Sequence, residues 1–164
     1  NDYLQKANAN KDWRAIYGEP NLRQKDKELI LRFLALYFDI AAYERPMKLF
    51  LTNFMRKNQT LHKLTEAELA KVFEGAVAVA STALGRQMFR PQRALNASVA
   101  DAILVGIARR LQLGPITDTK ALRSAVEATI QSAEFEDLYQ VGTTNVDKVT
   151  GRIDMIENAI KGVE

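Results

Sequence analysis

The chain has 164 residues, of which 47% are hydrophobic and 26% charged, and its formal net charge is +3. This length and balance are typical of a single globular domain with a sizeable core. The absence of cysteine excludes disulfides, thiolate metal sites and a cysteine nucleophile. Because no apolar run reaches the roughly 18 residues needed to cross a bilayer, and the amino end lacks signal-peptide features, we expect a soluble cytoplasmic domain that contacts no membrane.

Apolar residues repeat with a helical period along almost the whole chain, and strand-like alternation is nearly absent. Helices are expected over residues 2–7, 11–17, 27–43, 46–57, 66–84, 97–111, 118–132, 135–139 and 144–160. Short loops join them, and no repeat or long linker interrupts the series. The sequence therefore predicts one all-α domain over residues 1–164, a compact multi-helix bundle of about eight or nine helices.

Local signals mark where several of these helices begin. Asn10, Asp26 and Asn96 each precede an apolar period and are predicted to cap the helix that follows. Pro46 suits a first helical position, and Thr65 with the glutamate three residues later forms a capping box. On the helix over 46–57, the spacing predicts inward side chains at Met47, Phe50, Leu51, Phe54 and Met55.

The helix over 27–43 is apolar on nearly every side, yet it carries Arg32 at its centre. That pattern indicates a buried helix, in which a guanidinium must be paired or must reach outward. Glu28 lies four residues earlier, in the favourable acid-before-base order. We therefore expect a helix-surface pair between Glu28 and Arg32. A phosphate-binding or active-site role is the alternative.

Few residues suggest catalysis or metal binding. The single histidine, His62, has no cysteine or second histidine to share a metal ion, and it is interpreted as structural or exposed. The acids in the segment 134–137 could hold a hard cation, but the helix dipole also explains them. The segment 142–145, Gly-Thr-Thr-Asn, could seat a phosphate, although a turn and an N-cap account for it. No catalytic residue, metal ligand or cofactor is therefore predicted.

The connection over residues 86–95 is the best candidate for contact with nucleic acid. Arginines interleaved with an aromatic side chain such as Phe89 can clamp a phosphate backbone and stack on a base. The alternative is an ordinary basic loop in which Phe89 fills the core. The connection carries Arg86, Arg90 and Arg93, and the following helix adds Arg109 and Arg110.

An ordered set of short patterns extends over essentially the whole chain. In chain order it comprises Asp26-x-Glu28-Leu29-x-Leu31-Arg32-Phe33-Leu34-Ala35, Lys48-x-Phe50-Leu51-x-Asn53-x-Met55, Phe89-Arg90, Leu95-Asn96, Asp101-Ala102-Ile103, Gly142-Thr143-Thr144, Val149 and Arg152. This set resembles the helical carboxyl half of the family catalogued as domain of unknown function 262, named also for the GmrSD-type modification-dependent restriction endonucleases. The resemblance implies a piece of a bacterial anti-phage defence protein.

In that family the chemistry belongs to an amino-terminal ParB/sulfiredoxin-like α/β domain, whose Asp-Gly-Gln-Gln-Arg motif is linked to nucleotide hydrolysis and DNA cleavage. This chain has no such motif, and one histidine cannot provide the HNH-type nuclease that members often add. No catalytic residue of the family therefore carries over. The lack of an initiator methionine and the start within a predicted helix fit a fragment of a longer protein, so the α/β domain is expected outside this chain.

The resemblance thus implies a non-catalytic helical domain that supports or regulates its own amino-terminal catalytic domain, a nuclease and NTPase, and helps to position DNA. Two alternatives remain open. One is a stand-alone nucleic-acid-binding module that uses Arg86, Arg90 and Arg93. The other is a protein-interaction or oligomerisation scaffold.

Overall fold

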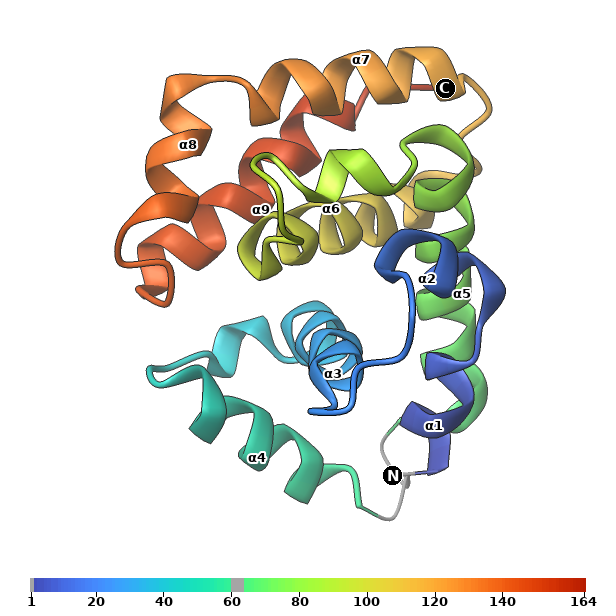
Figure 1. Ribbon diagram of the computed structural model, residues 1–164, viewed down its shortest axis with the longest axis vertical. Helices are drawn as coiled ribbons and strands as arrows, with labels where there is room; N and C mark the ends of the chain where they lie inside the picture. Colours follow the sequence, from blue (N-terminus) through green and yellow to red (C-terminus); the bar gives the residue numbers. More distant parts are fainter. Residues whose placement is uncertain (1, 60–63) are drawn as a thin grey trace.

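The computed structural model describes residues 2–59 and 64–164, and within them all regular secondary structure is helical (Figure 1). This confirms the predicted all-α bundle of eight or nine helices. The described part of the chain forms α1 (Asp2–Asn8), α2 (Lys11–Tyr17), α3 (Lys25–Phe38), η1 (Ile40–Ala42), α4 (Met47–Lys57), α5 (Glu66–Ala83), η2 (Arg86–Phe89), α6 (Ala97–Arg110), η3 (Leu111–Leu113), α7 (Thr119–Ile130), α8 (Ala133–Gln140) and α9 (Val146–Ile160).

Three of the predicted helix starts are confirmed by their hydrogen bonds. The Asn10 side chain accepts from the backbone N–H groups of the first turn of α2, and Asn96 does the same for α6. Thr65 Oγ1 accepts from the Glu68 N–H at 3.2 Å while the Glu68 carboxylate accepts from the Thr65 N–H at 2.8 Å, which completes the capping box. The Thr65 N–H and hydroxyl donors lower the pKa of Glu68.

Other expectations about boundaries and faces are wrong. Asp26 does not cap α3, because the helix already begins at Lys25. The buried Asp26 carboxylate instead accepts hydrogen bonds from Asn8 of α1 and Arg14 of α2. The helix ends at Phe38 rather than 43, where the chain turns so that α4 can pack back against α3. Pro46 precedes α4 as its N-cap. Met55 is 45% exposed, because α4 is covered on one face only.

Helix α6 forms the centre of the bundle, with α3, α5 and α9 packed around it. Nearly all of its side chains are buried, polar Ser98 and Asp101 included. Helix α9 lies closest, at Gly106, where an added Cβ would fall 2.7 Å from Cγ2 of Ile156. Only glycine allows this approach, so the α6–α9 spacing depends on it.

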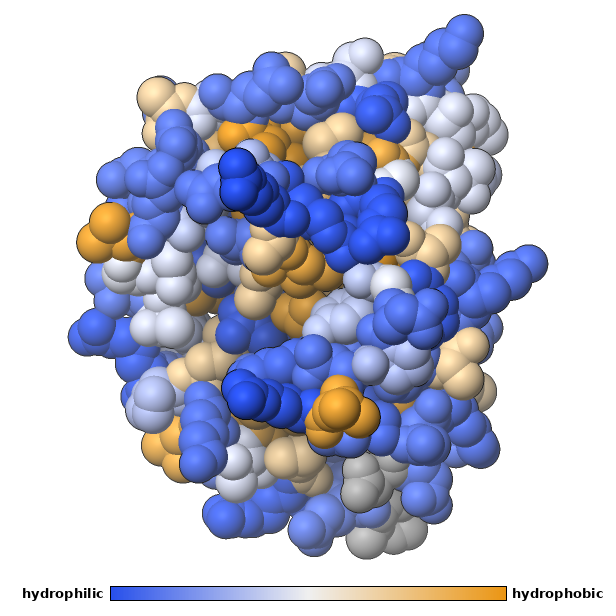
Figure 2. All heavy atoms as spheres, viewed as in Figure 1, coloured by the Kyte–Doolittle hydropathy of each residue, from blue (hydrophilic) through white to orange (hydrophobic). Residues whose placement is uncertain are grey.

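Aromatic side chains fill the space between α2, α3 and α5. The ring of Phe73 lies 6.0 Å from Trp13 and 5.9 Å from Phe33, centroid to centroid. Hydrophilic side chains cover most of the face shown in Figure 2. None of the described helices combines the length and apolar character needed to cross a membrane.

Candidate functional site

Three charged side chains from three helices meet in the core. Arg32 of α3, Asp101 of α6 and Arg152 of α9 are 9%, 2% and 0% exposed. The Arg32 guanidinium donates two hydrogen bonds to the Asp101 carboxylate, through Nε at 3.2 Å and through Nη2. Nη2 of Arg152 lies 3.5 Å from Asp101 Oδ2. We call these residues the buried ion cluster. It joins the three helices at the centre of the fold.

The buried ion cluster contains two cations and one anion. Burial opposes the charge on Arg32, but the Asp101 carboxylate outweighs it and raises the pKa of the guanidinium above its usual value. For Arg152 burial dominates, and its pKa is lowered. Nη1 of Arg152 donates to the Thr143 carbonyl at 2.7 Å, whereas Nε and Nη2 find no hydrogen-bond acceptor in the part of the chain that the structure describes. Asp101 therefore balances Arg32 more completely than Arg152.

The expected Glu28–Arg32 pair is wrong. Glu28 instead pairs with Lys25 on the surface at 3.1 Å, and the partner of Arg32 is Asp101, 69 residues away in the sequence. The physical reason is the direction of the side chain, since Arg32 lies on the face of α3 that packs against α6. A spacing rule within one helix cannot identify a partner on another.

The segment 142–145 is a turn that other elements hold in place. The Thr143 carbonyl accepts from Arg152, and the Thr144 carbonyl accepts from the Tyr43 hydroxyl at 2.7 Å. The Asn145 side chain accepts from Arg45 Nη1 at 2.7 Å and occupies the N-cap position of α9 without making a side-chain cap bond. The interpretation as a turn before a helix start is consistent with this geometry.

The arginines of the 86–95 connection have different environments. Arg90 is half-buried and donates to the carbonyls of Ile16 at 3.0 Å and Tyr17 at 2.8 Å, so it caps the carboxyl end of α2. Phe89 is completely buried, as the core alternative predicted. Arg86 and Arg93 are exposed. Figure 2 shows strongly hydrophilic side chains gathered over this segment, which runs across the front of α6 in Figure 1.

Arg109 and Arg110 lie at the carboxyl end of α6, the end farther from the 86–95 connection. A helix of 14 residues is about 20 Å long, at about 1.5 Å per residue. Arg109 pairs with Glu157 at 2.7 Å, and Arg110 donates to the Val163 carbonyl through Nε at 3.1 Å. The structure therefore does not bring these two arginines together with Arg86, Arg90 and Arg93.

The remaining candidates from the sequence, the acids of segment 134–137 and His62, do not form a common site among the described residues. Glu134, Glu136 and Asp137 lie on α8, where Asp137 pairs with Lys148 of α9. Within residues 2–59 and 64–164, no group of three His, Cys, Asp or Glu side chains could hold a metal ion. His62 lies outside the described residues.

Sequence reasoning missed Asp101 and Arg152 as a pair of interest. Asp101 carried a signal, since it is a charged residue inside an apolar helical run, as Arg32 is, whereas the helix of Arg152 contains several other charged residues. A charged residue in such a run predicts a buried partner, because charges are buried only when they are paired, but it does not identify that partner.

No protein-family model, curated protein or solved structure matches the chain. The family expected from the ordered patterns therefore stays a prediction.

Proposed function

We propose that this chain is a non-catalytic helical domain of a bacterial, cytoplasmic, modification-dependent restriction protein. In this proposal it supports a nuclease and NTPase domain and helps to position DNA. The catalytic groups belong to that other domain, and the helical domain supplies a rigid body against which it packs.

One observation supports the proposal most directly. Three charged residues of the ordered patterns, Arg32, Asp101 and Arg152, come together as the buried ion cluster. Two further polar members, Asp26 and Arg90, bond to donors or carbonyls of neighbouring helices. Residues used in this way specify a fold, not a reaction, which is what a supporting domain requires.

The open reading frame around the chain tests the proposal. We expect an α/β segment with the Asp-Gly-Gln-Gln-Arg motif upstream of residue 1. A complete reading frame without that segment overturns the proposal. In a second test, the purified 164-residue chain is incubated with nucleoside triphosphates, Mg²⁺ and plasmid DNA, and no turnover is expected. Activity that a point substitution within the chain abolishes would place the chemistry here and reject the proposal.

Arg86 and Arg93 favour a second candidate function, direct DNA binding. Both are exposed, and neither forms an ion pair with any described residue. Free guanidinium groups on one loop can contact successive phosphates. Arg90 is less available for this role than Arg86 and Arg93, because its guanidinium is half-buried and caps α2.

A salt titration with a fluorescent DNA duplex tests this second function. If Arg86 and Arg93 each contact a phosphate, the variant R86A/R93A should reduce the slope of log K against log salt by about two, at about 0.9 per contact. The control R56A/K120A removes the same charge from exposed positions elsewhere and should retain the slope. An identical slope in R86A/R93A and the wild type, or no binding at low salt, rejects this function.

A further inference from the structure

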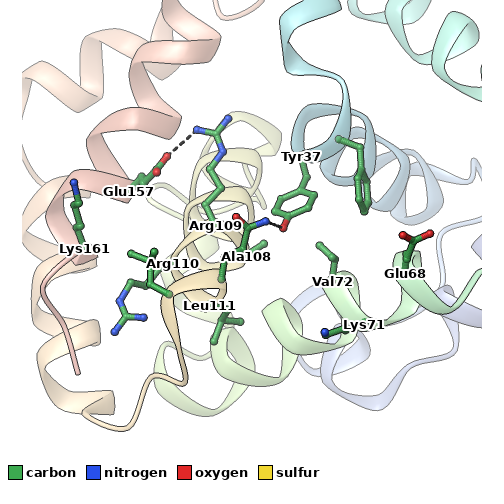
Figure 3. A pocket seen from close by; sticks show the side chains of 13 residues that line it. Tyr37, Glu68, Lys71, Val72, Ala108, Arg109, Arg110, Leu111, Glu157 and Lys161 are labelled. Carbon is green, nitrogen blue, oxygen red and sulfur yellow. Dashed lines mark hydrogen bonds and ion pairs between the residues drawn. The ribbon is translucent and has the colours of Figure 1, made fainter. Parts of the chain in front are cut away.

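A groove of about 950 Å³ lies where α3, α5, η3 and α9 border the carboxyl end of α6 (Figure 3). It is separate from the 86–95 connection, and the proposed function makes no use of it. The groove is open to solvent and is not an enclosed cavity.

Part of the groove lining is apolar. Tyr37 and Phe38 of α3, Val72 of α5 and Leu111 of η3 are only half-buried, although they pack against the core. Leu113 is 69% exposed beside them. Apolar side chains left accessible in a groove can pack against another surface.

Most charged groups of the groove already have partners within the fold. Arg109 pairs with Glu157, and Arg110 donates to carbonyls at the end of the chain. Glu68 belongs to the capping box of α5. Their hydrogen-bonding groups are therefore mostly used within the fold, although the exposed Glu68 carboxylate has no cationic partner among the described residues.

Two lysines remain. Lys71 of α5 and Lys161, just after α9, are exposed, and neither forms an ion pair among the residues that the structure describes. Figure 3 shows them on opposite sides, with the side chains of Ala108 and Leu111 between them. An apolar strip flanked by two unpaired cations is complementary to a ligand with an apolar face and acidic flanks.

We propose that this groove binds an acidic amphipathic helix from another protein. The occupant is helical because every wall of the groove is helical and offers no strand edge with which an extended segment could pair. A docked segment must therefore satisfy its own backbone, as a helix does. Its apolar residues, at helical spacing, lie on Tyr37, Val72 and Leu113, and its carboxylates face Lys71 and Lys161.

Selection from a displayed library of random 16-residue peptides tests the proposal without a known partner. The wild-type domain is the target, and K71E/K161E is the counter-selection target. We expect enriched peptides with apolar residues at i, i+3, i+4 and i+7 and with Asp or Glu on the flanks. Enrichment of basic peptides, or of no sequence beyond those that K71E/K161E also retains, overturns the proposal.

An enriched peptide is then synthesised with a fluorescent label, and its binding is followed by anisotropy. K71E/K161E should weaken binding about tenfold or more, which corresponds to about 1.4 kcal/mol, and affinity should fall as salt rises. Leu113→Asp should weaken it similarly. The control K11E/K120E makes the same charge change at exposed lysines outside the groove and should bind as the wild type does. Equal affinity in K71E/K161E and K11E/K120E overturns the proposal, and helical circular dichroism confirms that each variant is folded.

Light scattering over a concentration series addresses a second copy of the chain as the occupant. We expect a monomer at all concentrations. A dimer that K71E/K161E abolishes would mean that the groove binds another copy, and the proposal would be wrong.

Discussion

Two carboxylates are buried in the described part of the chain, Asp26 and Asp101, and they differ in the donors and cations that compensate their charge. Asp26 accepts from Asn8 Nδ2 at 2.9 Å, from Arg14 Nη1 at 3.2 Å and from the backbone N–H groups of Asn21 and Lys27 at 3.2 and 3.0 Å. Although burial alone would raise the pKa of Asp26, these donors together lower it. Asp101 meets two guanidinium groups instead, and one of them, Arg152, keeps two nitrogens without a hydrogen-bond acceptor among the described residues.

The difference shows two uses of a buried carboxylate: Asp26 mainly accepts hydrogen bonds, whereas Asp101 compensates buried cations. Asp26 gathers mostly neutral donors, so its loss removes hydrogen bonds but leaves only one cation, Arg14, which is partly exposed. Asp101 is the only anion of the buried ion cluster, so its loss leaves two buried cations uncompensated. Mutations at the two sites should therefore differ in size and in their dependence on pH.

The largest effect is expected for Asp101→Asn. Breaking a buried ion pair by removing one partner typically costs about 3–5 kcal/mol, and here the amide leaves Arg32 and Arg152 facing each other. Urea denaturation followed by circular dichroism measures the loss. The control Asp39→Asn removes a surface pair with Lys57 and should cost less than about 1 kcal/mol. Equal losses at the two sites would remove the distinction between them.

The triple variant R32M/D101L/R152M tests whether the cost of Asp101→Asn comes from the uncompensated cations that it leaves. Apolar replacement of a whole buried ion group is often neutral or stabilising, so we expect the triple variant to be more stable than Asp101→Asn alone. If it is less stable, the buried ion cluster contributes net stability of its own, contrary to this expectation.

The next prediction compares the loss of stability on replacing Arg32 with that on replacing Arg152. Arg32→Met should destabilise the fold by at least about 1 kcal/mol more than Arg152→Met, because Arg32 makes two hydrogen bonds to Asp101, and hydrogen bonds to charged groups are each worth about 1.5–3 kcal/mol. Removing Arg152 also removes a surplus buried charge. Thermal unfolding of the two variants under one condition measures the order, and the reverse order would contradict the assigned pairing.

Asp26→Asn should destabilise the fold by about 1–3 kcal/mol at neutral pH, through weaker hydrogen bonds. The pKa of Asp26 is lowered in the folded state, so its contribution is fully present above the unfolded pKa of about 3.9. It is lost as pH falls through the folded pKa. The gap in stability between wild type and Asp26→Asn should therefore be constant from about pH 5 to 7 and shrink below pH 4. A gap that widens in acid would contradict the lowered pKa.

The smallest effects concern arginines that have no carboxylate partner. Arg90→Ala removes the donor that caps α2 and should cost about 1–2 kcal/mol. Arg86→Ala and Arg93→Ala change exposed side chains and should stay within about 0.5 kcal/mol. Thermal unfolding of the three variants shows whether stability and DNA binding can be separated on this loop.

Local features were predictable from the sequence, and long-range ones were not. The caps at Asn10, Thr65 and Asn96 involve residues two or three positions apart, so their patterns specify them directly. Asp26 shows the limit of this local reasoning. Aspartate is a common N-cap residue, but here its carboxylate accepts hydrogen bonds from residues of α1 and α2. The sequence indicated that Arg32 needs a partner, but only the packing of α3 on α6 identifies Asp101.

The same reasoning applies to the candidate sites. The basic character of the 86–95 connection was visible in the sequence, yet only the fold distinguishes Arg90, which bonds to carbonyls of α2, from the exposed Arg86 and Arg93. The groove beside Lys71 and Lys161 combines residues from four helices and had no sequence signal.

The close approach of α9 to α6 at Gly106 has a consequence for synthesis of the protein in the cell. Because α6 is translated well before α9, its apolar surface and Asp101 emerge from the ribosome without the helix that covers them. Nascent chains that expose such a surface are prone to aggregate and to bind chaperones. Chains truncated ahead of residue 146 should therefore aggregate or bind chaperones more than the complete fold does.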